Sequence, residues 1–259
     1  MDLYKKIDFY KIAIDKLRPF EGDLFTQIKN YFRISLTWSS NALEGNTLTE
    51  VETKVLLEDG LTVGGKTLLE IFETLGHANA YDLMFTLLSR HKITEADTLA
   101  MHRALYKNID GKAAGRYRDR PATIIGSQYP ACLPDEMKNL FSWAVNERDH
   151  YHPVEFAAQL HKRLVFIHPF ADGNGRLARL LMNAVLIQDG YMLAVIPPKL
   201  RQEYVSLLEQ AHRDDRPFMA FIAERVLDSE REMIRLLHIP HPSVDEHGQD
   251  QKGHTRPED

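Results

Sequence analysis

The stretch from Ile167 to Arg179, which reads IHPFADGNGRLAR, constrains this chain more than any other feature. The histidine at 168 precedes a proline, so its backbone is pushed toward an extended or turn conformation. Gly173 and Gly175 permit left-handed or closely approached backbone. Apolar residues then recur at helical spacing until Gly190, at positions Leu177, Leu180, Leu181, Ala184 and Val185. The sequence therefore predicts a glycine-rich turn that runs into the N-terminus of a helix.

The same turn carries the side chains of an anion-binding and group-transfer site. The N–H groups and the dipole at a helix N-terminus favour negative charge. Arg176 and Arg179 lie three residues apart on the first turn and can grip phosphates. Asp172 is a hard oxygen ligand suited to Mg²⁺ beside phosphates, and His168 can accept a proton near neutral pH. A glycine-rich loop with a core histidine and two surface arginines would explain each feature singly. Their combination favours transfer from a nucleoside triphosphate.

The sequence from His168 to Arg179 resembles the signature of the Fic family, His-Pro-Phe-x-Asp/Glu-Gly-Asn-Gly-Arg-x-x-Arg, with every fixed position present. The resemblance implies a mainly helical Fic fold and transfer of AMP from ATP to a Ser, Thr or Tyr hydroxyl of a target protein. It also implies His168 as the general base and Asp172 as the Mg²⁺ ligand. The ATP-binding residues that it implies are Asp172, Gly173, Asn174, Gly175, Arg176, Leu177, Ala178, Arg179 and Tyr204.

Within that set, the glycines and the asparagine between them resemble the cradle of the α- and β-phosphates, and the two arginines resemble contacts to the β- and γ-phosphates. Tyr204 resembles a residue that lines the adenine pocket. A core tyrosine on an amphipathic helix fits its spacing equally well.

A second motif, Ser40-Asn41-Ala42-Leu43-Glu44-Gly45, lies near the front of the chain. Ser40 and Glu44 are i,i+4 neighbours on one helical face, and a carboxylate in a last helical turn opposes the dipole unless a cation is near. The segment resembles the inhibitory motif of the same family, with Ser40, Glu44 and Gly45 at its fixed positions. The resemblance implies a salt bridge from Glu44 to Arg179 in the place of the ATP γ-phosphate. The alternative is a solvated glutamate at a frayed helix end.

Between Gly115 and Pro134 the pattern is no longer helical. Residues 122–125 form a short β-prone run, followed by turn residues and a second extended piece. The Fic family places a flap hairpin here, over the active site, which can add an extended target segment as a strand. We therefore expect an all-α chain with one small β-hairpin flap, whose target-binding residues are Thr123, Ile124, Ile125 and Gly126.

Helical patterns account for most of the remaining chain. We predict helical structure over residues 5–44, 49–60, 67–88, 94–110, 134–149 and 153–166, over a helix that carries Tyr204, and from Pro217 to Leu237. We divide the chain into an N-terminal helical region with the inhibitory helix at 1–92, a Fic catalytic core at 93–237 and a polar tail at 238–259. Within the core, residues 164–169 and 180–183 particularly resemble the metazoan endoplasmic-reticulum Fic enzyme.

Composition narrows the compartment and the partners. The formal net charge of −5 gives no broad basic surface for nucleic acid. The single cysteine, Cys132, excludes an internal disulfide framework and fits a reducing compartment. The chain has no 18-residue apolar run and no apolar core of a signal peptide at its N-terminus. We expect a cytoplasmic protein that binds ATP and a protein substrate, with no membrane and no nucleic acid partner, and we leave a homodimer open.

The sequence thus predicts a protein adenylyltransferase that needs ATP and Mg²⁺ and is autoinhibited by Glu44. Two alternatives stay open. A dual-function or de-AMPylating hydrolase would use Glu44 to position the water that removes AMP. A non-enzymatic regulator would only bind ATP and a partner, although such a sensor has no need of a base at His168. Nothing in the sequence separates the transferase from the hydrolase.

Overall fold

The structure is a computed structural model that describes residues 2–88, 92–122, 127–131 and 135–240. The described part contains ten α-helices and no β-strand, which confirms the all-α prediction. The predicted flap residues Thr123, Ile124, Ile125 and Gly126 lie outside the described residues, as does nearly all of the predicted tail. The helices are α1 (Leu3–Asp15), α2 (Gly22–Leu43), α3 (Glu50–Lys54), α4 (Leu68–Thr86), α5 (Glu95–Tyr106), α6 (Glu136–Glu147), α7 (Pro153–Ile167), α8 (Asn174–Gln188), α9 (Arg201–Gln210) and α10 (Arg216–Leu236).

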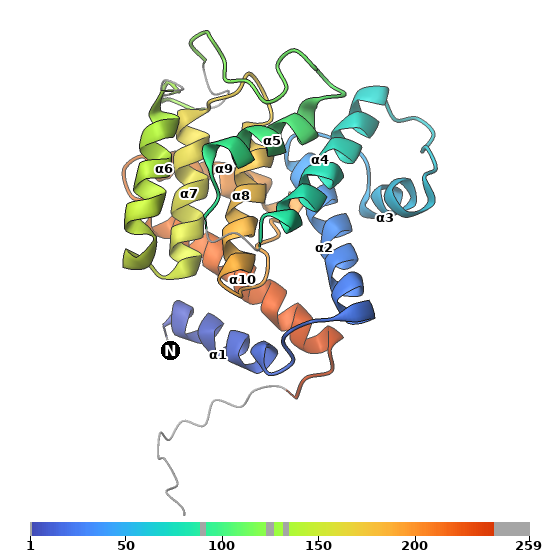
Figure 1. Cartoon of the computed structure of the whole chain (residues 1–259), viewed down its shortest axis with the longest axis vertical. Helices are drawn as coiled ribbons and strands as arrows, with labels where there is room; N and C mark the ends of the chain where they lie inside the picture. The colour runs from blue at the N-terminus through green and yellow to red at the C-terminus, as the bar shows by residue number, and fades with distance from the viewer. Residues whose placement is uncertain (1, 89–91, 123–126, 132–134, 241–259) are drawn as a thin grey trace, which may run out of the picture.

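Helix α8 lies at the centre of the bundle (Figure 1). It packs against α7 on one side and against α4, α5 and α2 on the others, while α10 supports α7 and α1. Every residue from Asn174 to Leu186 is buried except Gly175, so this helix is covered on all faces. A helix of this kind is held rigidly by packing. The predicted site residues at its N-terminus are therefore held in place by the packing of the core.

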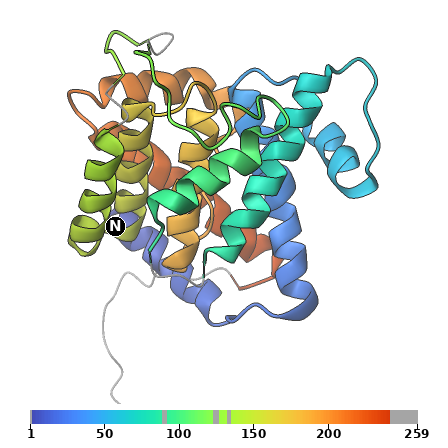
Figure 2. The same ribbon diagram turned by 45° about the horizontal axis from the view of Figure 1, so that its top comes forward.

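One hydrophobic core joins the predicted N-terminal region to the predicted catalytic region. Ile7 of α1 and Phe32 of α2 belong to the same cluster of buried side chains as Leu177 of α8 and Phe218 of α10. A smaller cluster of Leu48, Leu56 and Ile71 supports α3, which lies at the edge of the bundle (Figure 2). None of the helices in the described part is long and apolar enough to span a bilayer.

The continuous helical pattern predicted over residues 5–44 was wrong in one respect. The structure divides this segment into α1 and α2, with a turn between Asp15 and Gly22. Pro19 lies in that turn, and a proline inside a helix removes a hydrogen bond and clashes with the preceding turn. Arg18 fixes the turn because its Nη2 donates to the carbonyl of Gly190, at 3.0 Å, just beyond the end of α8. The apolar pattern continues through the turn because both helices pack on one core.

Capping boxes begin three of the predicted helices. Thr49 caps α3 and Thr67 caps α4, each with the glutamate three residues later bonding back to the cap N–H. Thr94 caps α5 in the same way, with Asp97 as its partner. A π-helical turn, Val55–Asp59, extends α3 to Gly60, whose φ of 67° ends it. Helix α5 ends at Tyr106, four residues earlier than predicted, so that Tyr106 lies in its last turn.

Glu230 of α10 is buried and has no hydrogen-bond partner among the described residues. Burial raises the pKa of this carboxyl to about 9, and the charge of Asp8 on α1 acts in the same direction. The interface between α1 and α10 therefore contains a carboxyl group that stays protonated at neutral pH.

Candidate active site

The loop from Ile167 to Gly173 joins α7 to α8 and is closed by its own side chains. His168 ends α7 in a left-handed conformation with φ 50° and ψ 55°, and its N–H bonds the carbonyl of Leu164 at 2.9 Å. The Asn174 side chain accepts from the N–H of Phe170 and donates to its carbonyl, both at 2.9 Å. Gly173 begins α8 with φ 81°, where a side chain would be strained. The asparagine predicted for the phosphate cradle therefore also holds the loop in shape.

Arg118 fixes the backbone on which His168 lies. Its Nε donates to the His168 carbonyl at 2.8 Å, and its N–H donates to the Pro169 carbonyl at 2.9 Å. Burial lowers the pKa of the His168 imidazole, and the Arg118 guanidinium lowers it further. The ring is therefore neutral at pH 7 and able to accept a proton.

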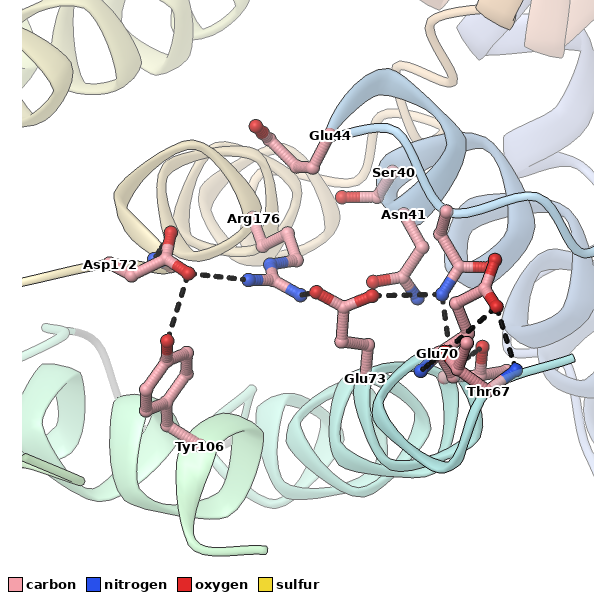
Figure 3. A network of polar contacts seen from close by, with 12 residues as sticks. Ser40, Asn41, Glu44, Thr67, Glu70, Glu73, Tyr106, Asp172 and Arg176 are labelled. Atoms are coloured by element: carbon pink, nitrogen blue, oxygen red, sulfur yellow. Dashed lines mark hydrogen bonds and ion pairs between the residues drawn. The ribbon is translucent and has the colours of Figure 1, made fainter. Parts of the chain in front are cut away.

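Asp172 lies on the exposed side of the loop, with 63% of its side chain accessible. Its Oδ2 accepts from the Tyr106 hydroxyl at 2.8 Å (Figure 3). Its Oδ1 accepts from the Gly173 N–H at 2.6 Å. His102 accepts from the Gly115 N–H through Nδ1, so its proton lies on Nε2, which donates to the Asp172 carbonyl at 3.0 Å. The carboxylate and the backbone of this residue are thus both held from α5.

Arg176 is buried and paired with a glutamate that the sequence analysis missed. Its Nη1 lies 2.9 Å from Oε1 of Glu73 on α4, and its Nη2 lies 3.5 Å from Asp172. The other oxygen of Glu73 accepts from the Asn46 side chain at 3.0 Å. Asn46 follows directly after Glu44 and Gly45, so Glu73 connects this arginine to the chain that leaves α2.

Arg179 is also buried, and α2 supplies three acceptors for it. Its Nη2 lies 2.6 Å from Oε1 of Glu44 and 2.9 Å from the Ser40 carbonyl, and its Nε donates to the Ser40 hydroxyl at 2.9 Å. The Glu44 side chain itself is 39% exposed. A Cβ built at Gly175 would collide with the Glu44 carboxylate, so the missing side chain at this position makes room for that group. The ion pair that the inhibitory motif implies is therefore present in the structure.

Tyr204 of α9 contacts Arg179 and is buried. Its hydroxyl contacts Arg179 Nη1 at 3.4 Å and His161 Nε2 at 2.9 Å. Burial lowers the pKa of His161 to about 3, and Arg179 acts in the same direction, so the histidine is neutral. The contacts of Tyr204 support the arginine. Its role toward adenine stays a prediction.

The remaining signature positions build the start of α8. Leu177 and Ala178 are buried in the core, and Gly173 and Gly175 flank the first residue of the helix. The N–H groups of a first helical turn have no partners within the helix and favour an anion. Two buried guanidinium groups lie on the same turn. This arrangement can bind a polyphosphate.

The donor set fits a magnesium ion held together with phosphates. No group of three or more His, Cys, Asp or Glu side chains able to hold a metal was found among the described residues. Mg²⁺ is commonly bound by one or two carboxylates together with substrate phosphates, and Asp172 offers one exposed carboxylate beside the turn that is predicted to bind phosphates.

Comparison with known proteins gives one consistent result. Residues 92–186 match the model of the Fic/DOC family. The chain is 39% identical over 201 residues to Protein adenylyltransferase Fic of Nematostella vectensis, covering 74% of this chain and 47% of that protein. It is 38% identical over 200 residues to the protein of the same name from Drosophila grimshawi, covering 74% and 41%. The chain thus spans less than half the length of these curated relatives.

Solved structures agree with the sequence matches. Residues 134–508 of Fic-1 from C. elegans superpose with a TM-score of 0.79 and 28% identity, covering 91% of this chain and 73% of that chain. A Fic domain containing signaling protein from Bacteroides thetaiotaomicron superposes with a TM-score of 0.82 and 28% identity, covering 94% of this chain and 100% of that chain.

Proposed function

The chain belongs to the Fic/DOC family, and we propose that it is a protein adenylyltransferase that transfers AMP from ATP to a Ser, Thr or Tyr hydroxyl of a target protein. Curated relatives that carry the name Protein adenylyltransferase Fic support the reaction class. The observation that carries the proposal is the meeting of a neutral histidine, an exposed carboxylate and two buried arginines at one helix N-terminus.

His168 acts as the general base in this proposal. Its imidazole accepts the proton of the target hydroxyl while the hydroxyl oxygen attacks the α-phosphorus of ATP. The bond between the α-phosphorus and the bridging oxygen then breaks, and pyrophosphate leaves with that oxygen. The lowered pKa supports this role because the ring is already unprotonated at neutral pH. Arg118 holds the backbone of His168 and so fixes the ring beside the loop.

The start of α8 binds the triphosphate. The N–H groups of its first turn face the phosphates, and Arg176 and Arg179 stabilise the charge that develops on the leaving pyrophosphate. Asp172 would hold Mg²⁺ against the phosphates. When bound, the ion neutralises phosphate charge and helps to orient the α-phosphorus.

Glu44 acts as the brake. In this structure the Glu44 carboxylate pairs with Arg179, with Oε1 2.6 Å from Nη2, and it fills the space beside Gly175. A γ-phosphate that needs Arg179 must displace this carboxylate. While Glu44 stays in place, ATP binds in a pose in which the α-phosphorus cannot be attacked in line.

A second candidate function uses the same carboxylate. Because 39% of the Glu44 side chain is exposed beside the phosphate-binding turn, it can orient a water toward an AMP group on a modified protein. This activity would release AMP and regenerate the hydroxyl. The predicted target-binding residues Thr123, Ile124, Ile125 and Gly126 would serve either direction.

Incubation of the chain with ATP labelled in the α-phosphate tests the proposal. Label should appear on protein, should need Mg²⁺, and should be absent with His168→Ala. Release of labelled AMP from pre-modified protein, lost with Glu44→Gly, would instead support the hydrolase. Label on neither protein nor released AMP would refute both enzymatic functions and leave the ATP-binding regulator.

Location and assembly are separate proposals. The single cysteine supports a reducing compartment such as the cytoplasm. Fractionation of cells that express the tagged full-length protein tests this location. Sedimentation of the purified chain over a range of concentrations tests the homodimer.

A further inference from the structure

We propose that Tyr106 is a positioning residue for Asp172, because its hydroxyl fixes the orientation in which the carboxylate meets the metal ion. The inference rests on the proposed function, since a metal at Asp172 is part of that function. Tyr106 lies outside the Fic signature, in the last turn of α5 and 66 residues before its partner in sequence. No motif in the chain indicates this residue.

The contact between the two side chains defines the orientation of the carboxylate. The Tyr106 hydroxyl donates to Oδ2 at 2.8 Å, and the Gly173 N–H donates to Oδ1 at 2.6 Å. Each oxygen of Asp172 therefore has a donor from the protein, and Oδ2 has a second, longer contact with Nη2 of Arg176 at 3.5 Å. The side chain is nevertheless 63% exposed, so lone pairs remain available to a ligand on the open side.

Tyr106 is itself held rigidly. Its side chain is buried, and its ring stacks on His102 with centroids 5.4 Å apart and planes 17° apart. His102 in turn stacks on Phe170 of the signature loop, at 3.7 Å and 10°. Figure 3 shows Tyr106 pointing from α5 toward Asp172. Two side chains one helical turn apart on α5 thus support the loop, one through the Asp172 carbonyl and the other through its carboxylate.

The phenol acts as a donor and not as a metal ligand. Its hydroxyl is the donor in the 2.8 Å contact with the carboxylate Oδ2 of Asp172, which can only accept. A hydroxyl that donates to a carboxylate and is covered by protein is also no acceptor for AMP. A phenylalanine ring at this position would keep the stacking on His102. The hydroxyl oxygen is the atom that bonds Asp172.

Two effects of this hydrogen bond on the metal oppose each other. A donor withdraws charge from the carboxylate and weakens its bond to a cation. It also orients the carboxylate, and removal of such orienting partners typically weakens metal binding about 10–100-fold. Without the hydroxyl, the nearest cation is Arg176, 3.5 Å from the same oxygen, and Asp172 can turn toward it. The orienting effect therefore dominates.

The test measures nucleotide binding and does not depend on turnover. Calorimetry gives the Kd of α,β-methylene ATP, which cannot release pyrophosphate, in Mg²⁺ and again in EDTA. The parent is the full chain with Glu44→Gly, so that the brake does not mask binding. Tyr106→Phe removes the hydroxyl alone. Tyr191→Phe is the matched control. The Tyr191 hydroxyl also donates to an aspartate, Asp8 of α1, at 2.7 Å, and neither residue belongs to the predicted site.

We expect Tyr106→Phe to raise the Kd about 10–100-fold in Mg²⁺ and to leave it unchanged in EDTA, while the control changes neither. Equal changes in both conditions would show a general structural defect, and no change in either would show that the hydroxyl does not matter. Both results overturn the proposal. A parent whose affinity is the same in Mg²⁺ and in EDTA would also overturn it. That result would remove the metal from the proposed function before any Tyr106 variant is compared.

Discussion

Replacement of Glu44 by glycine should increase adenylylation of protein. The change removes one acceptor from Arg179 and leaves the Ser40 hydroxyl and carbonyl in contact with it at 2.9 Å. It also clears the space beside Gly175 that the carboxylate occupies. The γ-phosphate of ATP can then take the vacated contact, and the triphosphate can adopt the pose required for in-line attack.

The size of the effect follows from the exposure of the two partners. Breaking a buried pair costs about 3–5 kcal/mol, whereas an exposed pair contributes about 0.2–1 kcal/mol. Arg179 is 2% exposed but Glu44 is 39% exposed, so the pair lies between these limits, near 2 kcal/mol. An equilibrium shifted by about 2 kcal/mol changes roughly 30-fold. Helix weakening adds little, because Glu44 is the C-cap residue of α2 and not an interior one.

Incorporation of label from α-labelled ATP, including self-modification, measures the effect. Glu44→Gly should exceed the unmodified chain by about 10–100-fold. Glu44→Gln, which keeps the shape but loses the charge, should give a smaller increase. Adding Arg179→Ala to Glu44→Gly should abolish the gain, because the guanidinium that binds the phosphate is then absent. If Glu44→Gly incorporates no more label than the unmodified chain, the carboxylate is not the brake.

Four further predictions concern other residues. His168→Ala should lower transfer about 10²–10⁴-fold with little change in ATP affinity, since the base acts on the hydroxyl, and near-normal labelling would reject that role. Asp172→Ala should remove both activity and the Mg²⁺ dependence of nucleotide binding, and an unchanged Mg²⁺ titration would exclude it as the ligand. Glu73→Gln should weaken ATP binding measured by calorimetry, because the buried Arg176 guanidinium loses the carboxylate that holds it in position, whereas Asp82→Asn on the same helix should not. Glu230→Gln should raise the free energy of unfolding by up to about 3 kcal/mol at pH 7, because a carboxyl with a folded pKa of about 9 loses stability as pH rises above its unfolded pKa, near 4.5. Denaturant unfolding at pH 4 should show no such gain, and an equal gain at both values would refute the burial argument.

The sequence predicted the signature loop and the two ends of α8 because those features are local. A proline, two glycines and a run of apolar residues specify the turn and the helix within a short stretch. The capping boxes at Thr49 and Thr67 could be predicted for the same reason. Pro19 indicates a break in the helix, but apolar residues recur at helical spacing on both sides of it, so the pattern predicts one continuous helix.

The supporting residues could not be predicted in this way. Glu73 is 103 residues from Arg176 in sequence, and Tyr106 is 66 residues from Asp172. Each of the two residues lies on a helix whose apolar pattern indicates only which face is buried. Glutamate and tyrosine are both common residues in such helices. Their roles depend on which helices meet α8, which no local periodicity specifies. A buried charge such as Arg176 requires a partner, so the existence of a carboxylate was predictable, but its position was not.

The three contacts between α2 and Arg179 also have a consequence for the rate at which the proposed inhibition by Glu44 would be relieved. Two of the acceptors belong to Ser40 and do not have to move when the third, Glu44, gives way to a phosphate. We therefore expect the guanidinium to keep its two Ser40 contacts during the exchange, so that the exchange needs no large activation step. We therefore predict that the proposed inhibited and active states interconvert rapidly compared with turnover. Inhibition should appear as a constant fraction of full activity from the first turnover, with no lag before the steady state.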